Sequence, residues 1–329
     1  MKKINVILAA LTLFGLMTGC NSNNTNTSAT DETQTVAEIT MTLAPKYKNC
    51  ELEVKIGGNG AITIDWGDGS PVDTLTIDPP LVERIIIGNG EVKRLMVPEA
   101  TAPYKHNYAL SGEYTVKITG DDITELYCFN NELTTLDVSK YPTLKKLTCF
   151  ITPLSTLDLS KNTALEELEC NSCQLTSLDL SKNTALKQLE CKSNQLTTLD
   201  LSKNTALESL SCKGNQLTSL DLSKNTALIY LNCSNNKLTA LDVSQNTALT
   251  ELYCHHNELT SLDLSNNTAL TEMWCLENNL SAAALNALFR SLCSSDSYKK
   301  IHVWDNPGAG ACDRSIAEKK QWWVDDVGD

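Results

Sequence analysis

The chain has 329 residues, 41% of them hydrophobic, and its formal net charge is −13 because 40 acidic residues outnumber 27 lysines and arginines. This acidic balance argues against nucleic acid and anionic membrane surfaces as partners, because both bind basic patches. Even if the first 20 residues are set aside, the chain is long enough for two folded units.

Residues 1–20 have a basic start, an apolar run and small residues before Cys20. This pattern predicts a signal peptide rather than a membrane span, and no later apolar run is long enough to cross a bilayer. It also resembles a bacterial lipoprotein signal, although Met17 stands where that family usually has leucine. The resemblance implies that Cys20 carries the lipid and anchors an exported protein to the outer membrane, facing the cell surface or the periplasm. Residues 21–36 are rich in Asn, Thr and Ser, which predicts a flexible tether.

Residues 37–120 change to a period of two with frequent turn residues, which predicts an all-β sandwich. The stretches ITIDWGDGS and YKHNYALSGEYTVKITG resemble the opening and closing strands of a polycystic kidney disease (PKD) type domain. The middle of the region, around Pro79 and Pro80, departs from that pattern. PKD-like domains of bacterial surface proteins usually act as spacers or auxiliary binding modules. Asp65 and Asp68 are interpreted as hairpin-turn residues, with calcium binding as the alternative.

Eight cysteines then recur every 21 residues, and we call them the ladder cysteines: Cys128, Cys149, Cys170, Cys191, Cys212, Cys233, Cys254 and Cys275. An unbroken period of this length predicts a solenoid of stacked coils. The unit L-x-x-L-x-C-x-x-N-x-L resembles the leucine-rich repeat. That resemblance implies one short parallel strand per coil, with the strands lining a concave face. We expect regular repeats over residues 121–281 and a terminal repeat with a C-terminal cap over residues 282–329.

Two columns of the repeat are expected inside the solenoid. Parallel side chains one strand apart, ~4.8 Å, do not suit the closer Cβ approach of a disulfide, so the ladder cysteines are predicted to be buried thiols. An asparagine column follows three residues after the ladder position: Asn131, Asn194, Asn215, Asn236, Asn257 and Asn278. Its amides are predicted to bond backbone groups where the chain leaves each strand. A Cys293–Cys312 disulfide is one option for closing the cap.

An aspartate column lies on the outer side of the coils: Asp137, Asp158, Asp179, Asp200, Asp221, Asp242 and Asp263. Neighbouring carboxylates repel, so something must offset their charge. The Ser-Lys-Asn-Thr turn that follows most of them supplies hydroxyl and amide donors, which predicts turn-bonding, solvated aspartates. Calcium along this ridge is the alternative, and no other cofactor or metal is expected.

The C-terminal region is expected to contain one helix and one more strand. The segment SAAALNALFRSLCSS predicts an amphipathic helix with Ser281 as its N-cap. KKIHVWDN then predicts a strand with Val303 at the ladder position and Asn306 in the asparagine column. The tail is expected to cover the end of the core with Trp322 or Trp323 packed against it. The region resembles the ends of leucine-rich-repeat lipoproteins of the Bacteroidetes type. The fold class expected for the whole chain is α+β or all-β.

Residues that flank the ladder position are expected to point outward onto the concave face. Aromatic residues gather there at the C-terminal end, and we predict a ligand-binding patch made by Tyr230, Tyr253, His255, Trp274, His302 and Trp304. Exposed aromatic clusters mark contact surfaces, and flat rings also suit sugars. The alternative is that the tail folds over part of this patch. At the other end, Tyr127, Phe129 and Phe150 are expected to pack against the β-sandwich.

These patterns favour a non-enzymatic envelope lipoprotein that binds a protein or glycan. A structural spacer or assembly component of the outer envelope is the alternative. A metal-dependent hydrolase using His255, Glu251 and His302 is a remote third hypothesis, since the chain has only four histidines and no G-x-S-x-G, H-E-x-x-H or phosphate-loop pattern.

Overall fold

The structure is a computed structural model that describes residues 37–45, 50–77, 81–88, 91–98, 104–129 and 132–325, with the backbone alone for 81–88 and 91–98. The predicted signal peptide, Cys20, the tether and Asn131 lie outside the described residues. Among the helices that are described, none is long and apolar enough to cross a membrane.

The N-terminal part is built from antiparallel strands. Those joined to the main sheet are β1 (Glu38–Leu43), β2 (Cys50–Asp65), β3 (Asp73–Ile77), β6 (Tyr104–Tyr108), β7 (Tyr114–Phe129) and β8 (Leu133–Asp137). A separate hairpin contains β4 (Leu81–Gly88) and β5 (Glu91–Pro98), which among the described strands pair with each other alone. Along β1 the buried side chains are Ile39, Met41 and Leu43, and this alternation is the one that the period of two predicts.

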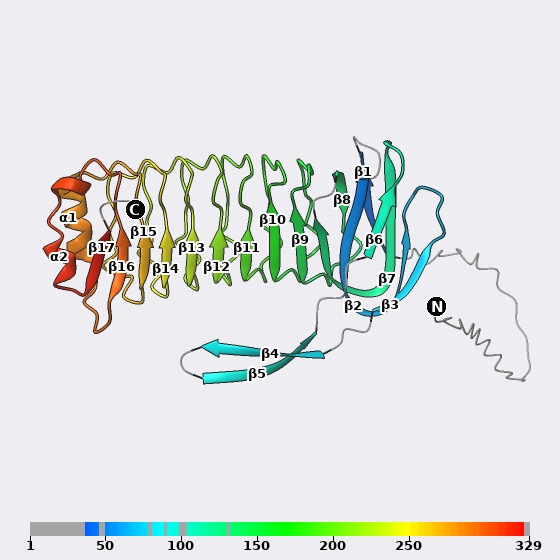
Figure 1. Cartoon of the computed structure of the whole chain (residues 1–329), viewed down its shortest axis with the longest axis horizontal. Helices are drawn as coiled ribbons and strands as arrows, with labels where there is room; N and C mark the ends of the chain where they lie inside the picture. Colours follow the sequence, from blue (N-terminus) through cyan, green and yellow to red (C-terminus); the bar gives the residue numbers. More distant parts are fainter. Residues whose placement is uncertain are drawn as a thin grey trace, which may run out of the picture. The chain divides into compact units, whose positions relative to one another are not determined.

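The repeats stack as parallel strands, one per coil. These strands are β9 (Lys146–Phe150), β10 (Glu167–Asn171), β11 (Gln188–Glu190), β12 (Ser209–Ser211), β13 (Tyr230–Asn232), β14 (Glu251–Tyr253) and β15 (Glu272–Trp274). Figure 1 shows them side by side in chain order. Each residue pairs with the one 21 positions further along, as Leu231 does with Leu252. The predicted parallel solenoid with few helices is therefore confirmed.

Strand β7 belongs to both parts of the described chain. Its first half pairs antiparallel with β1, and its last residues pair in parallel with β9, so that Cys128 lies opposite Cys149. One 15-stranded sheet thus runs from the N-terminal strands through the repeats. The division expected between residues 120 and 121 falls inside this strand. Where β2 crosses β7, a side chain at Gly58 would come within 1.9 Å of the Asp122 carbonyl oxygen, so only glycine fits this position.

The ladder cysteines all lie inside, as predicted. Each is 0% exposed and is a thiol rather than part of a disulfide. Burial raises the pKa of the Cys212 and Cys275 thiols to about 12. Cys170 and Cys173, the only pair with C-x-x-C spacing, also both point into the core. The ladder cysteines therefore pack as small apolar side chains.

The asparagine column bonds the backbone as expected. In one coil, Asn215 Nδ2 donates to the carbonyls of Cys191 and Cys212, both at 2.9 Å, while its Oδ1 accepts from the backbone N–H of Leu196 at 3.1 Å. A second buried column, which the sequence reasoning missed, donates to two carbonyls of the preceding coils: Asn162, Asn183, Asn204, Asn225, Asn246 and Asn267. These amides supply donors to turns whose carbonyls would otherwise be buried unpaired.

The C-terminal cap contains α1 (Ala282–Ser291), β16 (Lys299–His302), the short helices η1 (Ala309–Ala311) and α2 (Ser315–Glu318), and β17 (Trp322–Asp325). Ser281 is the N-cap, since its Oγ accepts from the Ala284 N–H at 3.2 Å. Val303 and Asn306 are buried at the ladder and asparagine positions, as predicted. In Figure 1 the helices α1 and α2 lie at the end of the row of strands.

The suggested Cys293–Cys312 disulfide is wrong for this structure, because both residues are thiols. Cys312 Sγ instead donates to the Ala309 carbonyl at 3.2 Å. Trp322, which is 1% exposed, donates from Nε1 to the Cys293 carbonyl at 2.9 Å. A buried tryptophan therefore holds the cap, and this part of the expectation for the tail is confirmed.

Candidate ligand-binding face

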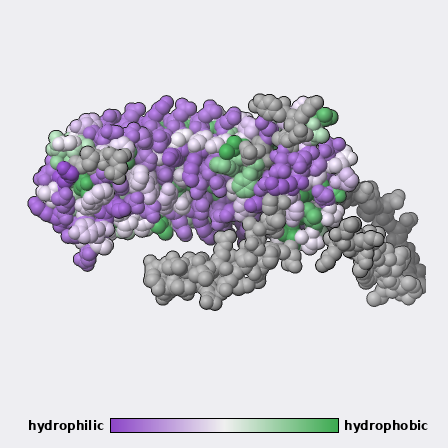
Figure 2. Space-filling view, in the orientation of Figure 1, coloured by the Kyte–Doolittle hydropathy of each residue, from purple (hydrophilic) through white to green (hydrophobic). Residues whose placement is uncertain are grey.

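The outward face of the parallel sheet, which we call the strand face, presents two side-chain columns over β13–β17. Strand pairing places Asn232, Tyr253, Trp274, His302 and Asp325 in one column. The neighbouring column contains Tyr230, Glu251, Glu272, Lys300 and Trp323. In the view of Figure 2 the repeats present a mostly hydrophilic surface. The strand pairings set the aromatic residues of these columns beside the charged side chains of Glu251, Glu272 and Lys300.

Five of these side chains form a continuous series of ring contacts, and we call Tyr230, Tyr253, Trp274, His302 and Trp323 the aromatic row. Successive ring centroids are separated by 5.6, 5.8, 4.6 and 6.0 Å. The first four side chains are half-buried, whereas Trp323 is 51% exposed. Tilted and edge-on arrangements at these separations are favourable for aromatic pairs, so the rings support one another.

The structure brings together five of the six residues predicted for the patch. Tyr230, Tyr253, Trp274 and His302 lie in the row, and the His255 ring flanks Trp274 at 5.8 Å. Trp304 is half-buried two positions along the His255 column, beyond Leu276, and no ring contact joins it to the row among the described side chains.

Trp323 is the residue that sequence reasoning missed. The tail adds β17 beside β16, and its register places Trp323 opposite Lys300, in the Tyr230 column. The available signal was the alternation in Trp-Trp-Val-Asp, which matches a repeat strand without its ladder cysteine. The tail therefore lengthens the row at its end. The alternative expectation was that the tail folds over the patch, but in the structure the tail forms the strand β17 at the edge of the patch.

The row is fixed by hydrogen bonds to carboxylates. Tyr253 Oη donates to Glu251 Oε2 at 2.9 Å, and Trp274 Nε1 donates to Glu272 Oε1 at 2.8 Å. Burial, and next the bond to Glu251, raises the pKa of Tyr253, so its hydroxyl remains a donor. At the last pair, His302 Nδ1 lies 2.9 Å from Asp325 Oδ2. The ring orientations are therefore set before any ligand arrives.

His255 is held neutral beside the row. Burial lowers its pKa to about 4, helped by the nearby charges of His256 and Lys213. Its Nδ1 is buried and has no hydrogen-bond partner in the described part of the chain. His256 lies with Nδ1 2.6 Å from Glu277 Oε2. At neutral pH the His255 imidazole adds aromatic surface rather than charge.

The remote hydrolase hypothesis required Glu251, His255 and His302 to converge. In the structure Glu251 is bonded to Tyr253, and His302 is bonded to Asp325. Within the described ranges, no group of three or more His, Cys, Asp or Glu side chains is arranged to hold a metal ion.

The N-terminal half of the strand face has a different character. Tyr127 and Phe129 stack at 6.1 Å, and Lys55 Nζ from β2 lies 5.6 Å from the Phe129 ring centroid. Phe150 is 36% exposed. The strand β2 pairs with this end of β7, so Tyr127 and Phe129 lie against the N-terminal strands, in line with expectation.

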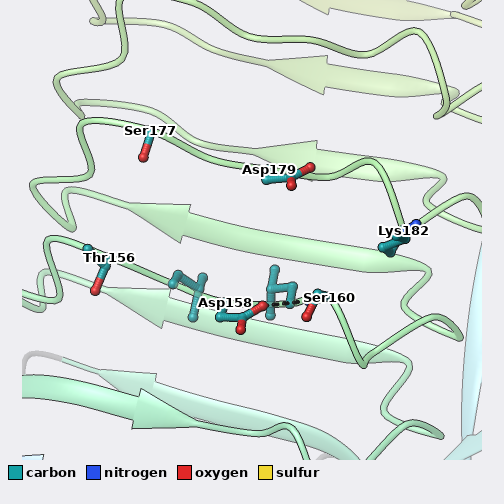
Figure 3. Close-up of a pocket in the computed structure, with 8 residues that line it drawn as sticks. Thr156, Asp158, Ser160, Ser177, Asp179 and Lys182 are labelled. Carbon is teal, nitrogen blue, oxygen red and sulfur yellow. Dashed lines mark hydrogen bonds between the residues drawn. The ribbon is translucent and has the colours of Figure 1, made fainter.

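The aspartate column lies on the coils away from the strands and caps turns. Asp158 Oδ1 accepts from the Ser160 N–H at 2.9 Å, and Asp179 does the same with Ser181. These bonds lower the pKa of both carboxyl groups. Figure 3 shows Asp158 and Asp179 on successive coils with Lys182 nearby, lining a furrow of about 260 Å³. The turn-bonding interpretation is confirmed, and calcium on this ridge stays an untested expectation.

In the N-terminal part the acidic turn has the same kind of role. Asp65 Oδ1 accepts from the Gly67 N–H at 2.9 Å, and Asp68 Oδ1 accepts from the Ser70 N–H at 3.0 Å. The second Asp68 oxygen lies 2.8 Å from His106 Nε2. Bonds to Ser70 and then to His106 lower the pKa of Asp68 to about 2. Both carboxylates therefore hold the turn together.

Comparison with known proteins gives structural neighbours without a family. No protein-family model matches the chain. No curated protein matches it either. An internalin, InlF of Listeria monocytogenes, is similar with 21% identity and a TM-score of 0.50 over 59% of this chain and 58% of that one. This likeness shows the fold. The repeat region has a leucine-rich-repeat solenoid of the internalin type.

Two further solved structures are similar at lower TM-scores. One is the functional domain of InlJ from Listeria monocytogenes, described as including a cysteine ladder, with 29% identity and a TM-score of 0.38 over 63% of this chain and 56% of that one. The other is the leucine-rich-repeat protein LIC12759 of Leptospira interrogans, with 21% identity and a TM-score of 0.48 over 58% and 57%. The chain thus spans less than two thirds of the length of these neighbours.

Proposed function

We propose that this protein is a non-enzymatic binding module that holds a partner protein on the strand face over β13–β17. The observation that carries the proposal is the aromatic row, a series of ring contacts over five successive parallel strands. Tyrosine and tryptophan contribute most of the binding energy at protein interfaces. Rings already held by their carboxylate partners lose little conformational freedom on binding.

We further propose that the module is displayed on the cell envelope. The support is in the sequence: a lipoprotein-like signal ending at Cys20, followed by the polar tether of residues 21–36. In this proposal the lipid on Cys20 anchors the protein to the outer membrane. Residues 37–120 act as a PKD-like spacer, supported by the W-G-D-G turn around Trp66 and by Tyr108 Oη, which donates to the Trp66 carbonyl at 2.9 Å.

The test is capture of candidate ligands by a variant that lacks the centre of the row. Tyr253→Ala combined with Trp274→Ala is compared with wild type on arrays of extracellular-matrix proteins, envelope proteins and glycans. The control is Phe150→Ala combined with Tyr298→Ala, because these aromatics are exposed and lie outside the row. Removing two central aromatic anchors is expected to weaken capture by about 100-fold or more.

The outcomes separate the alternatives. Loss of protein capture in the row variant alone, with a thermal melt close to that of the control, supports the proposal. Loss of glycan capture alone would assign the row to sugars instead. Capture of a single envelope protein in fixed stoichiometry favours the assembly role. Equal capture by the row variant and the control would place the binding surface elsewhere.

A further inference from the structure

Resting on the proposed function, we propose that the aromatic row recognises a cationic segment, in which lysine or arginine side chains of the partner protein lie over the rings and contact Glu251 and Glu272. The inference concerns the charge of the partner, which the aromatic side chains alone do not specify.

The first step is the unequal pairing of glutamates along the strand face. In its N-terminal half, Glu167 pairs with Lys146 at 2.6 Å and Glu190 pairs with Lys192 at 2.7 Å. Glu251 and Glu272 lie directly opposite each other on β14 and β15, and neither forms an ion pair with any described side chain. Lysines therefore neutralise two glutamates of the N-terminal half, whereas Glu251 and Glu272 form an adjacent pair without such a partner among the described side chains.

The second step is the direction of the hydrogen bonds. The Tyr253 hydroxyl and the Trp274 indole N–H are both donated inward, each to one oxygen of its glutamate. The other oxygen of each carboxylate has no hydrogen-bond partner among the described residues, so it can accept from a ligand. The row therefore presents carboxylate acceptors and the negative faces of aromatic rings. Both attract cations, and a cation over tyrosine or tryptophan gains further when a carboxylate lies beside it.

The third step is the charge of the surroundings. Lys300 lies opposite Glu272 on β16, yet no ion pair joins them at 4.0 Å or less in the part of the chain described. Asp325, at the end of the row, is bonded to His302. The exposed face of Trp323 is available above this edge. With a net charge of −13 for the chain, the field around the row attracts a basic partner from a distance.

Glycans are the competing occupants of an aromatic face. A neutral sugar gains from flat rings and needs both donors and acceptors around its hydroxyl groups. Here the Tyr253 hydroxyl and the Trp274 indole N–H already donate to glutamates of the protein, so the surface offers mostly hydrogen-bond acceptors to a ligand. The complement of this surface is rich in donors and positively charged, as arginine and lysine side chains are.

The experiment uses two synthetic peptides as probes on the intact protein. A capped decapeptide of alternating arginine and glycine is titrated at 150 mM salt, with the glutamine–glycine equivalent as the neutral probe, and tryptophan fluorescence reports binding. The variant Glu251→Gln/Glu272→Gln removes two charges while its amide oxygens can still accept from Tyr253 and Trp274. The control Glu113→Gln/Glu258→Gln removes the same charge from exposed positions outside the row.

We expect the arginine peptide to bind the wild type, and to bind Glu251→Gln/Glu272→Gln about five- to tenfold more weakly. The control should change affinity by less than about twofold. Equal weakening in both double variants would overturn the inference, because attraction would then follow net charge alone. Binding of the glutamine peptide with the same affinity would also overturn it. In either case the proposed function would stand if Tyr253→Ala/Trp274→Ala still abolished ligand capture.

Discussion

Replacing Asn278 with alanine removes four hydrogen bonds from the interior of the last regular coil, one of them to the Leu276 carbonyl at 3.2 Å. Asn278 Nδ2 donates to the carbonyls of Cys254 and Cys275 at 3.1 Å, and Oδ1 accepts from the Leu259 N–H at 3.0 Å. The Leu259 N–H is then left buried without a partner, which costs ~1–3 kcal/mol, whereas the Cys254 and Cys275 carbonyls keep their bonds from Asn257 and Asn306. The total loss should therefore be about 2–4 kcal/mol. In a protein of this size such a loss lowers Tm by roughly 4 °C or more.

The neighbouring residue supplies a matched control. Asn279 is exposed, and its side chain has no hydrogen bond in the described structure, so Asn279→Ala should change stability by less than about 0.5 kcal/mol. Urea unfolding followed by far-UV circular dichroism measures both variants. If Asn278→Ala differs from Asn279→Ala by less than about 1 kcal/mol, the asparagine column does not secure the coils and the reasoning is refuted.

Three further predictions follow from individual residues. Ile151 is 48% exposed and has a φ of 53°, a left-handed conformation that strains a β-branched residue, so Ile151→Gly should stabilise the protein by about 1 kcal/mol. Gly214 has a φ of 70°, so Gly214→Ala should destabilise the protein by a similar amount. Urea unfolding midpoints measure both variants, and effects of the opposite sign would contradict the strain argument. In native protein, iodoacetamide should alkylate Cys293 and Cys312 before any ladder cysteine, as read by peptide mapping, and early reaction of a ladder cysteine would show that its coil opens. His255 has a pKa of about 4 and stays neutral in the folded protein, whereas the unfolded chain binds a proton at this residue below about pH 6.5. The free energy of unfolding should therefore fall as the pH is lowered from 6.5 to 4, and it should fall less in His255→Gln. Identical pH profiles of the two proteins would refute this.

The period of the ladder cysteines was enough to predict the repeats. A strict spacing of 21 residues allows one register, in which Cys191 and Cys212 lie inside while the residues beside them face outward. That is why five of the six predicted patch residues lie together. The contacts within the row could not be predicted, because the tilt of the rings and the bonds to Glu251 and Glu272 depend on side-chain conformations. The spacing of residues in the repeat does not determine those conformations.

Where the period ends, prediction weakened. The tail has no ladder cysteine, so β17 was taken as a cover instead of a strand, and Trp323 was missed. The Cys293–Cys312 disulfide, one option for closing the cap, rested only on two cysteines outside the ladder in one short region, and sequence does not give the directions of their side chains. Strand β7 pairs with β1 among the N-terminal strands and with β9 among the repeats. The sequence could not predict this, because alternating apolar residues indicate a strand without indicating which strands pair with it.

Hydroxyl-radical footprinting of the protein with its captured ligand tests the central claim most directly. Ligand should protect Tyr253, Trp274 and Trp323 from oxidation and leave the exposed Tyr298 as reactive as in the free protein. Protection confined to Tyr298, or to the aromatic residues of β7 and β9, with the row still oxidised at its original rate, would contradict the assignment of the strand face as the binding surface.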